Sequence, residues 1–255
     1  MDNSKAIVLF ENDDHKYIYL GVEKNNLEGI FTNQFLIIHK GKGILLDPGG
    51  VHVFPRVLAN VSEYIDTDDI IGVFYSHQDP DVSSGIALWS STLNNARFYV
   101  SALWERFLPH FGVFDSSSLV PLEDKGGKIE FPDGAHLDII PAHFLHSLGN
   151  FIVYDPIAKI LFSGDIGVGV VQPSESKYFV ENFDDYSKHM VGFHQRYMAS
   201  NIAAKKWVSI VSKLDVEMMT PQHGLLFKKR EYEQFLDWFK NLKCGVDLID
   251  DIYGM

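Results

Sequence analysis

The chain has 255 residues, of which 46% are hydrophobic and 13% aromatic, and this length and composition favour one large folded domain. Its 34 acidic and 22 basic residues give a formal net charge of -12, which repels phosphate backbones and argues against nucleic acid as a partner. We therefore expect a single domain over residues 1–255.

Cysteine usage limits the chemistry available to the chain. The single cysteine, Cys244, excludes an internal disulfide and any iron–sulfur or CxxC redox site within the chain, so a bound metal must be held mainly by nitrogen and oxygen. The first residues show no basic leader with a long apolar segment, and no later apolar run approaches about 18 residues. We expect a cytoplasmic protein with no membrane contact.

In chain order, the first elements that the sequence predicts are strands. β-rich runs alternate with turn signals in AIVLFE, KYIYLGV, NQFLIIH and GILLDPGG, which predicts strands joined as hairpins over the first fifty residues. Next we predict a helix over 54–65, a buried strand over 69–76, a helix over 83–92, a strand over 97–100 and a helix over 101–111.

The second half repeats this order of strands followed by helices. We predict strands with turns between them over residues 128–142 and 150–165. A long helical region is predicted over 185–214. A short strand at 217–224 and an amphipathic helix over 229–243 follow. Two β-rich halves, each ending in helices, predict an α+β fold in which two sheets lie face to face with helices outside them, an αββα sandwich.

Four segments place metal-ligating side chains directly after predicted strands. They are SHQDPDVSSG with His77, Asp79 and Asp81, PAHFLHSLGNF with His146, LFSGDIG with Asp165, and MTPQHG with His223. A rigid sheet can direct side chains from such loops at one point. Imidazoles and carboxylates are ligands for divalent iron, manganese and zinc, and a carboxylate can bridge two ions. The six residues therefore suffice for a binuclear site.

The order and spacing of these motifs resemble the metallo-β-lactamase superfamily over nearly the whole chain, and this resemblance implies the same αββα fold. The hydrolytic branch of that superfamily carries His-x-His-x-Asp-His and binds zinc, whereas this chain has Asp79 at the second position. That carboxylate makes the chain similar to the flavodiiron proteins and to their shorter relatives, the oxygen-binding diiron proteins. Their loop is normally His-x-Glu-x-Asp-His, and their metals are iron.

The resemblance implies that His77, Asp79 and His146 hold the first iron and that Asp81 and His223 hold the second, with Asp165 bridging. This chain departs from the family pattern twice: Asp79 is one methylene shorter than the usual glutamate, and Val82 stands where a histidine ligand is usual.

Three further residues are candidates for a role at the site. His143 and His194 are candidates to replace the missing histidine ligand, although an ordinary polar role explains both. The segment HQRYMASNIAAKKW resembles the helix beside the metal pocket of the family. We take its Tyr197 and His194 as candidate catalytic residues, with the Tyr197 hydroxyl as a hydrogen-bond donor to oxygen.

The function that the resemblance implies is a non-haem diiron protein that binds dioxygen or nitric oxide. It would act as a sensor, or as the core of a flavodiiron-type oxidoreductase that takes electrons from an external donor, since we see no FMN site in this chain. A homodimer and a signalling partner protein follow from the same resemblance. One alternative is a binuclear zinc hydrolase of a thioester, ester or phosphoester; another is a degenerate site in an interaction domain. Zinc and manganese are the alternatives to iron at the site.

Overall fold

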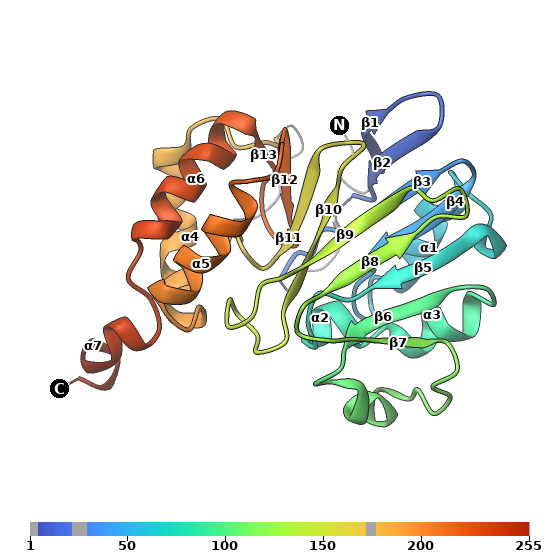
Figure 1. The fold of residues 1–255 in the computed structure, drawn as a ribbon, viewed down its shortest axis with the longest axis horizontal. Coiled ribbons are helices and arrows are strands. Elements are labelled where there is room, and N and C mark those ends of the chain that lie inside the picture. Colours follow the sequence, from blue (N-terminus) through green and yellow to red (C-terminus); the bar gives the residue numbers. More distant parts are fainter. Residues whose placement is uncertain (1–4, 22–29, 172–176, 255) are drawn as a thin grey trace.

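The computed structural model describes residues 5–21, 30–171 and 177–254, in which two β-sheets face each other between helices (Figure 1). The first sheet runs in chain order from β1 to β7. Its strands are β1 (Ile7–Glu11), β2 (His15–Tyr19), β3 (Phe35–His39), β4 (Lys42–Leu46), β5 (Ile70–Phe74), β6 (Arg97–Ser101) and β7 (Leu119–Leu122). β1 to β4 are antiparallel neighbours, whereas β4 to β7 run parallel.

The second sheet has the order β13-β12-β11-β10-β9-β8. Its strands are β8 (Gly127–Glu130), β9 (His136–Pro141), β10 (Phe151–Asp155), β11 (Ile160–Gly164), β12 (Met218–Pro221) and β13 (Phe227–Lys228). Only β11 and β12 are parallel to each other, and the remaining pairs are antiparallel.

The helices are α1 (Phe54–Ser62), α2 (Pro80–Ser83), α3 (Ile86–Thr92), α4 (Phe183–Tyr197), α5 (Asn201–Val211), α6 (Lys229–Asn241) and α7 (Ile249–Tyr253), with 3₁₀ helices at Thr67–Asp69, Glu105–Phe111 and Val246–Leu248. Two predicted helices are divided in the structure. The helix expected over 83–92 is separated from α2 at Gly85, where a side chain would collide with the Gly49 carbonyl oxygen. The helical region over 185–214 is interrupted between α4 and α5, where Met198 and Ser200 are extended.

Three separate hydrophobic clusters confirm the predicted four layers. One lies between the sheets, where Phe35 and Phe74 of the first sheet meet Phe162 of the second. A second cluster joins the outer face of the first sheet to α1 and α3, and a third joins the outer face of the second sheet to α4, α5 and α6. Because the central strands are covered on both faces, β3, β10 and β11 are fully buried and almost uniformly apolar.

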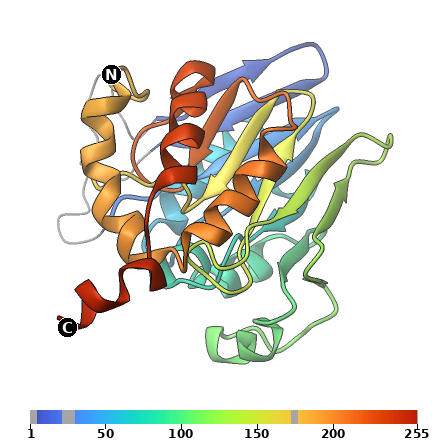
Figure 2. The same cartoon turned by 60° about the vertical axis from the view of Figure 1, so that its left-hand side comes forward.

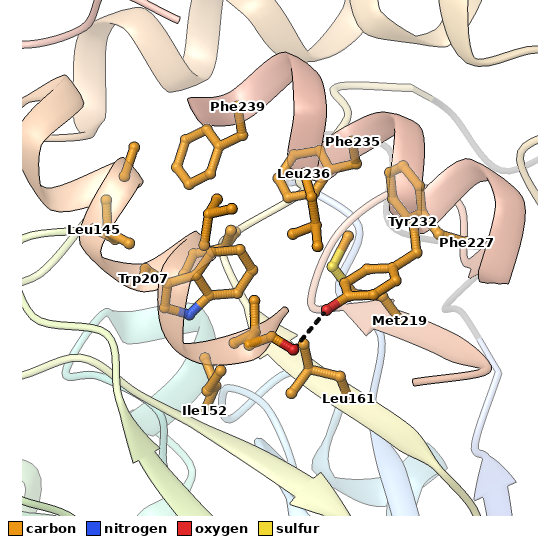
Figure 3. Packing of buried hydrophobic residues seen from close by; sticks show 14 of the residues in the cluster. Leu145, Ile152, Leu161, Trp207, Met219, Phe227, Tyr232, Phe235, Leu236 and Phe239 are labelled. Atoms are coloured by element: carbon orange, nitrogen blue, oxygen red, sulfur yellow. Dashed lines mark hydrogen bonds between the residues drawn. The ribbon is translucent and has the colours of Figure 1, made fainter. Parts of the chain in front are cut away.

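The third cluster shows how the helices attach to the second sheet. Phe235 and Phe239 of α6 stack at 5.2 Å between ring centroids and pack against Trp207 of α5 (Figure 3). Tyr232 donates a hydrogen bond to the Val211 carbonyl in the same cluster (Figure 3). α7 lies beyond this layer and extends away from the rest of the chain (Figure 2).

The strand order brings several strand ends to one edge of the sandwich. β4 and β5 end together because they are parallel, as do β11 and β12. Backbone hydrogen bonds join the two sheets there, from Phe151 N to Ser76 O at 3.0 Å and from Asn33 N to Gln222 O at 2.5 Å. In the described part of the chain, no helix is both long and apolar enough to cross a membrane.

Candidate metal centre

The six predicted ligands converge at the edge where the two sheets are joined. One donor atom from each of His77, Asp79 and His146 lies within 4.8 Å of the others. His146 Nε2 is 2.9 Å from Asp79 Oδ2, and His77 Nε2 is 3.8 Å from the same oxygen. These three residues form the first ligand group.

The second ligand group contains His223 and Asp81, and Asp165 lies between the two groups. His223 Nε2 is 3.2 Å from Asp81 Oδ2 and 3.4 Å from Asp165 Oδ1. The other oxygen of Asp165, Oδ2, is 3.4 Å from His146 Nε2 and 3.8 Å from His77 Nε2. Each carboxylate oxygen of Asp165 thus faces one group, which is the arrangement that a bridging ligand requires.

Hydrogen bonds from the outer side of His77 orient its ring. The Ser76 backbone N–H donates to Asp47 at 2.7 Å, the Ser76 hydroxyl bonds to the same carboxylate, and Ser76 Oγ lies 2.9 Å from His77 Nδ1. With Asp47 ionised, Ser76 gives its hydrogen to Asp47 and accepts one from His77 Nδ1. The lone pair on His77 Nε2 then points into the ligand groups, as metal-ligating histidines require.

A backbone carbonyl orients His223, and a hydrogen bond from Asn150 holds the loop that carries His146. His223 Nδ1 is 2.7 Å from the Phe31 carbonyl oxygen, to which it donates, so its Nε2 faces Asp81 and Asp165. His146 has a φ of 75°, a left-handed conformation that is uncommon for a residue with a side chain. The loop is fixed in it by Asn150, whose amide donates to the Leu145 carbonyl at 2.6 Å.

The electrostatics of the cluster reflect three carboxylates meeting three imidazoles. Burial opposes the charge on His223, but Asp165 and Asp81 raise its pKa to about 10. Burial would raise the pKa of Asp165, yet the neighbouring His77 and His223 hold it well below its usual range. Burial raises the pKa of Asp47 to about 8, against the hydrogen bonds from Ser76, and a cation at the ligand groups would favour its charged form.

Two buried atoms that could coordinate a metal indicate that the six ligand residues suit a metal ion. His77 Nε2 and Asp165 Oδ1 are buried and have no hydrogen-bond partner among the described residues. Leaving such groups unsatisfied costs free energy, and metal coordination removes that cost. The mixture of nitrogen and carboxylate oxygen, with no sulfur, fits divalent iron, manganese or zinc.

The residues considered as replacement ligands lie outside the cluster. His143 Nε2 bonds to the Asp124 carbonyl oxygen at 2.7 Å. His194 is fully buried, with Nδ1 donating to the Met190 carbonyl at 2.9 Å and Nε2 accepting from Gly167 N–H at 3.0 Å. Both His194 nitrogens are therefore occupied by the backbone. Val82 is also fully buried, in the hydrophobic cluster between the first sheet and helices α1 and α3, and its side chain has no atom that can coordinate a metal.

Two aromatic rings of α4 lie against His146, a ligand of the first group. Tyr197 and Phe193 stack on each other at 4.7 Å, and their centroids are 5.4 and 5.6 Å from that of His146. Tyr197 is half exposed, and its ring lies beside the first ligand group. Asn201, in the same sequence segment, instead bonds to the carbonyls of Lys240 and Leu242.

Sequence reasoning missed Asp47 and Ser76, the two residues that orient His77. A signal for Asp47 is present, because it directly follows the apolar run of β4 just as Asp165 follows that of β11. Ser76 carries no such signal, since its contact with Asp47 depends on how β4 and β5 pair.

The fold is that of the metallo-β-lactamase superfamily, in the branch of flavodiiron-like proteins. Residues 30–224 match the family described as ODP family beta lactamase, and the chain belongs to that family. It is 46% identical to the chemotaxis sensor ODP. Solved structures of that sensor include a peroxy diiron species, with a TM-score of 0.86, and the apo state from T. denticola, with a TM-score of 0.88. These matches cover 97% of this chain and 99% and 98% of those chains.

More distant relatives are longer proteins. A flavoprotein from Thermotoga maritima is 21% identical with a TM-score of 0.74, covering 92% of this chain and 60% of that one, which shows likeness of fold. An uncharacterised protein from Methanocaldococcus jannaschii is 25% identical over 84% of this chain. The chain spans about half the length of that curated relative, 54%.

Proposed function

We propose that this protein is a sensor that binds dioxygen at a pair of non-haem irons and reports its presence to a partner protein. The observation that carries this proposal is the convergence of six nitrogen and oxygen donors, with Asp165 between the two ligand groups. The 46% identity to a chemotaxis sensor over almost its full length supports it.

The charge of the ligand set favours iron over the alternatives, zinc and manganese. Asp79, Asp81 and Asp165 contribute three negative charges, which offset most of the four positive charges of two divalent ions and help to stabilise an oxidised form. Two ferrous ions would supply the electrons and open coordination positions that dioxygen needs. In the first group His77, Asp79 and His146 would hold one ion; Asp81 and His223 would hold the other.

The surrounding residues divide the remaining tasks. Asp47 and Ser76 orient His77, and the Phe31 carbonyl orients His223. We assign Tyr197, whose exposed ring packs beside His146, the role of hydrogen-bond donor to dioxygen. His194 holds the backbone at Gly167, two residues after Asp165, so we assign it a positioning role.

A zinc hydrolase is disfavoured because Asp79 and Val82 make the site poorer in nitrogen than that of the hydrolytic branch. The other parts of the proposal are one domain over the whole chain, cytoplasmic location, a homodimer and the absence of an FMN site. Light scattering tests the dimer, and flavin content of the purified protein tests the last part.

The experiment that tests the proposed function is metal analysis of protein expressed with iron without air, followed by optical spectra before and after exposure to oxygen. We expect two irons per chain and a new charge-transfer absorption on exposure. The variant Asp165→Asn, which removes the bridging charge, should lose iron and the absorption. Zinc alone with no spectral change would reject the proposal.

A second measurement separates a sensor from an oxygen reductase. Oxygen consumption is followed with reduced flavodoxin or rubredoxin as external donor, and nitric oxide is supplied in place of oxygen in a parallel series. Negligible consumption supports the sensor, whereas sustained turnover would assign the same site to reduction.

A further inference from the structure

An apolar cavity of about 300 Å³ lies behind the first ligand group. Its walls come from the ends of β5 and β6, from α3 and from the 3₁₀ helix Glu105–Phe111. The apolar lining includes Ile86, Val100, Trp104, Phe107, Leu108 and Phe111. His77, a metal ligand, and Gln78 line the same cavity, so these two side chains separate it from the ligand groups.

The polar groups at the inner end of this cavity are directed away from it. Gln78 Nε2 lies 3.3 Å from Asp79 Oδ1, and Gln78 Oε1 accepts a hydrogen bond from Ser147 at 2.7 Å. The Ser83 hydroxyl donates to the carbonyls of Gln78 and Asp79 at 2.8 and 3.0 Å. A solute that needs hydrogen bonds therefore finds these groups already occupied.

Two other polar atoms in the lining are covered by their neighbours. Tyr75 Oη and Trp104 Nε1 are buried, without a hydrogen-bond partner among the described residues. Since the cavity is large enough for solvent, atoms without accessible surface do not face it. The inner surface of the cavity is accordingly formed mostly by carbon.

The side of the ligand groups that faces solvent is polar, in contrast to the apolar cavity. The side chains of Asp79 and Asp81 are 36% and 25% exposed, so that side of the site carries negative charge and binds water. An apolar gas gains nothing from such a surface but is favoured in an apolar cavity, and a cavity of roughly 150 Å³ lined by apolar side chains is enough to bind xenon.

We infer that this cavity collects dioxygen and delivers it to the first ligand group past Gln78. The inference rests on the proposed function, because it names the path by which the proposed ligand arrives. Of the two side chains between the cavity and the ligand groups, Gln78 is the one that can move, because it is only partly buried. Its amide bonds to Asp79 and Ser147, and these two hydrogen bonds hold it in place. Movement of this amide would open the cavity to the ligands without displacing His77.

The first test uses metal-free protein, so that it does not depend on iron chemistry. Crystals of the wild-type chain are pressurised with xenon, and we expect one bound xenon against Ile86 and Val100. An empty cavity under xenon, or a cavity filled by an organic molecule carried through purification, would overturn the inference.

The second test fills the cavity with Val100→Phe and measures dioxygen association and dissociation in the iron-loaded protein. Val100 is buried in the lining and is not among the ligands. We expect xenon to be lost and both rates to fall several-fold together, leaving the equilibrium affinity and iron content unchanged. A blocked path slows arrival and departure equally, whereas a damaged iron site alters affinity.

The matched control is Val8→Phe on the exposed edge strand β1, which should keep wild-type rates. Unchanged rates in folded Val100→Phe protein, with the cavity shown to be filled, would reject the path while leaving the proposed function intact. Wild-type iron protein that does not react with oxygen would instead reject the proposed function and with it the path.

Discussion

Asp79 sets the charge of the first ligand group. It is an anionic oxygen donor 2.9 Å from His146 Nε2, at a position where the zinc-binding branch has a neutral imidazole. We predict that Asp79→His shifts the bound metal from iron towards zinc, because a softer neutral donor replaces a hard anionic one. The measurement is the iron-to-zinc ratio in protein expressed with both metals. Asp79→Glu, which keeps the charge, should retain iron, and unchanged iron uptake in Asp79→His would contradict the argument from charge.

His194 makes the stability of the fold depend on pH. Burial lowers its pKa from 6.5 to about 4, and the hydrogen bond to the Met190 carbonyl only partly compensates. Between these two pH values the unfolded chain binds more protons than the folded one, so the free energy of unfolding falls as the pH is lowered from 6.5 to about 4. The slope from this residue is about 1.4 kcal/mol per pH unit, and it vanishes above the upper value.

We therefore predict that His194→Gln, which can still donate and accept hydrogen bonds but does not titrate, loses this part of the acid dependence. Urea unfolding of metal-free protein at several pH values measures it. The exposed His189→Gln variant should keep the wild-type slope. Equal slopes for wild type and His194→Gln would mean that His194 is charged in the fold, and a direct role at the site would regain support.

At the scale of elements, a buried histidine pair joins the two sheets away from the metal centre. His15 of β2 and His39 of β3 approach each other at 3.2 Å between their Nδ1 atoms. His15 Nε2 is 2.7 Å from Asp155 at the end of β10, and His39 Nε2 is 3.0 Å from Asp133 in the turn between β8 and β9. The two outer nitrogens face carboxylates of the second sheet, so the pair links β2 and β3 to the end of β10 and to the turn between β8 and β9.

This arrangement predicts a large loss of stability for His15→Leu. Asp155 is fully buried, and removing its partner leaves Oδ2 without its hydrogen bond, which costs roughly 3 kcal/mol. The control is His136→Leu, whose contact with Asp138 is partly exposed and is expected to contribute about 0–1 kcal/mol. Urea unfolding measures both variants. Equal, small losses would show that the buried pair does not stabilise the contact between the sheets.

At the scale of the whole molecule, the sequence predicts those parts of the fold that depend on local patterns of apolar and turn residues. Apolar runs bounded by turn residues located β5, β11 and β12, and the ligands that follow them could be identified from their position. The αββα arrangement followed from the order of elements. β7 was missed because it has only four residues and includes Pro121.

What could not be predicted depends on contacts between segments distant in sequence. The division at Gly85 reflects close approach to Gly49, and the role of Asp47 depends on Ser76 from the neighbouring strand. The same holds for His194, whose spacing on α4 suggested a place beside the metals. Its partners Gly167 and Met190 become visible only in the folded chain.

The distribution of ligands between the sheets leads to a prediction for the entire fold. His77, Asp79 and Asp81 follow β5 of the first sheet, whereas His146, Asp165 and His223 follow strands of the second. Bound metal therefore joins the two halves of the sandwich, and because the unfolded chain does not assemble these ligands, binding adds to the free energy of unfolding. The gain is about 2.7 kcal/mol when free iron is 100 times its dissociation constant.

We predict that iron-loaded protein melts at a higher temperature than protein treated with a chelator, measured by calorimetry without air. Asp165→Asn should show a much smaller difference between the two conditions, because it weakens the ligand that contacts both groups. If chelation left the melting temperature of the wild type unchanged while the iron was demonstrably removed, the metals would not couple the sheets. The hydrogen bonds between Phe151 and Ser76 and between Asn33 and Gln222 would then suffice to hold this edge of the sandwich together.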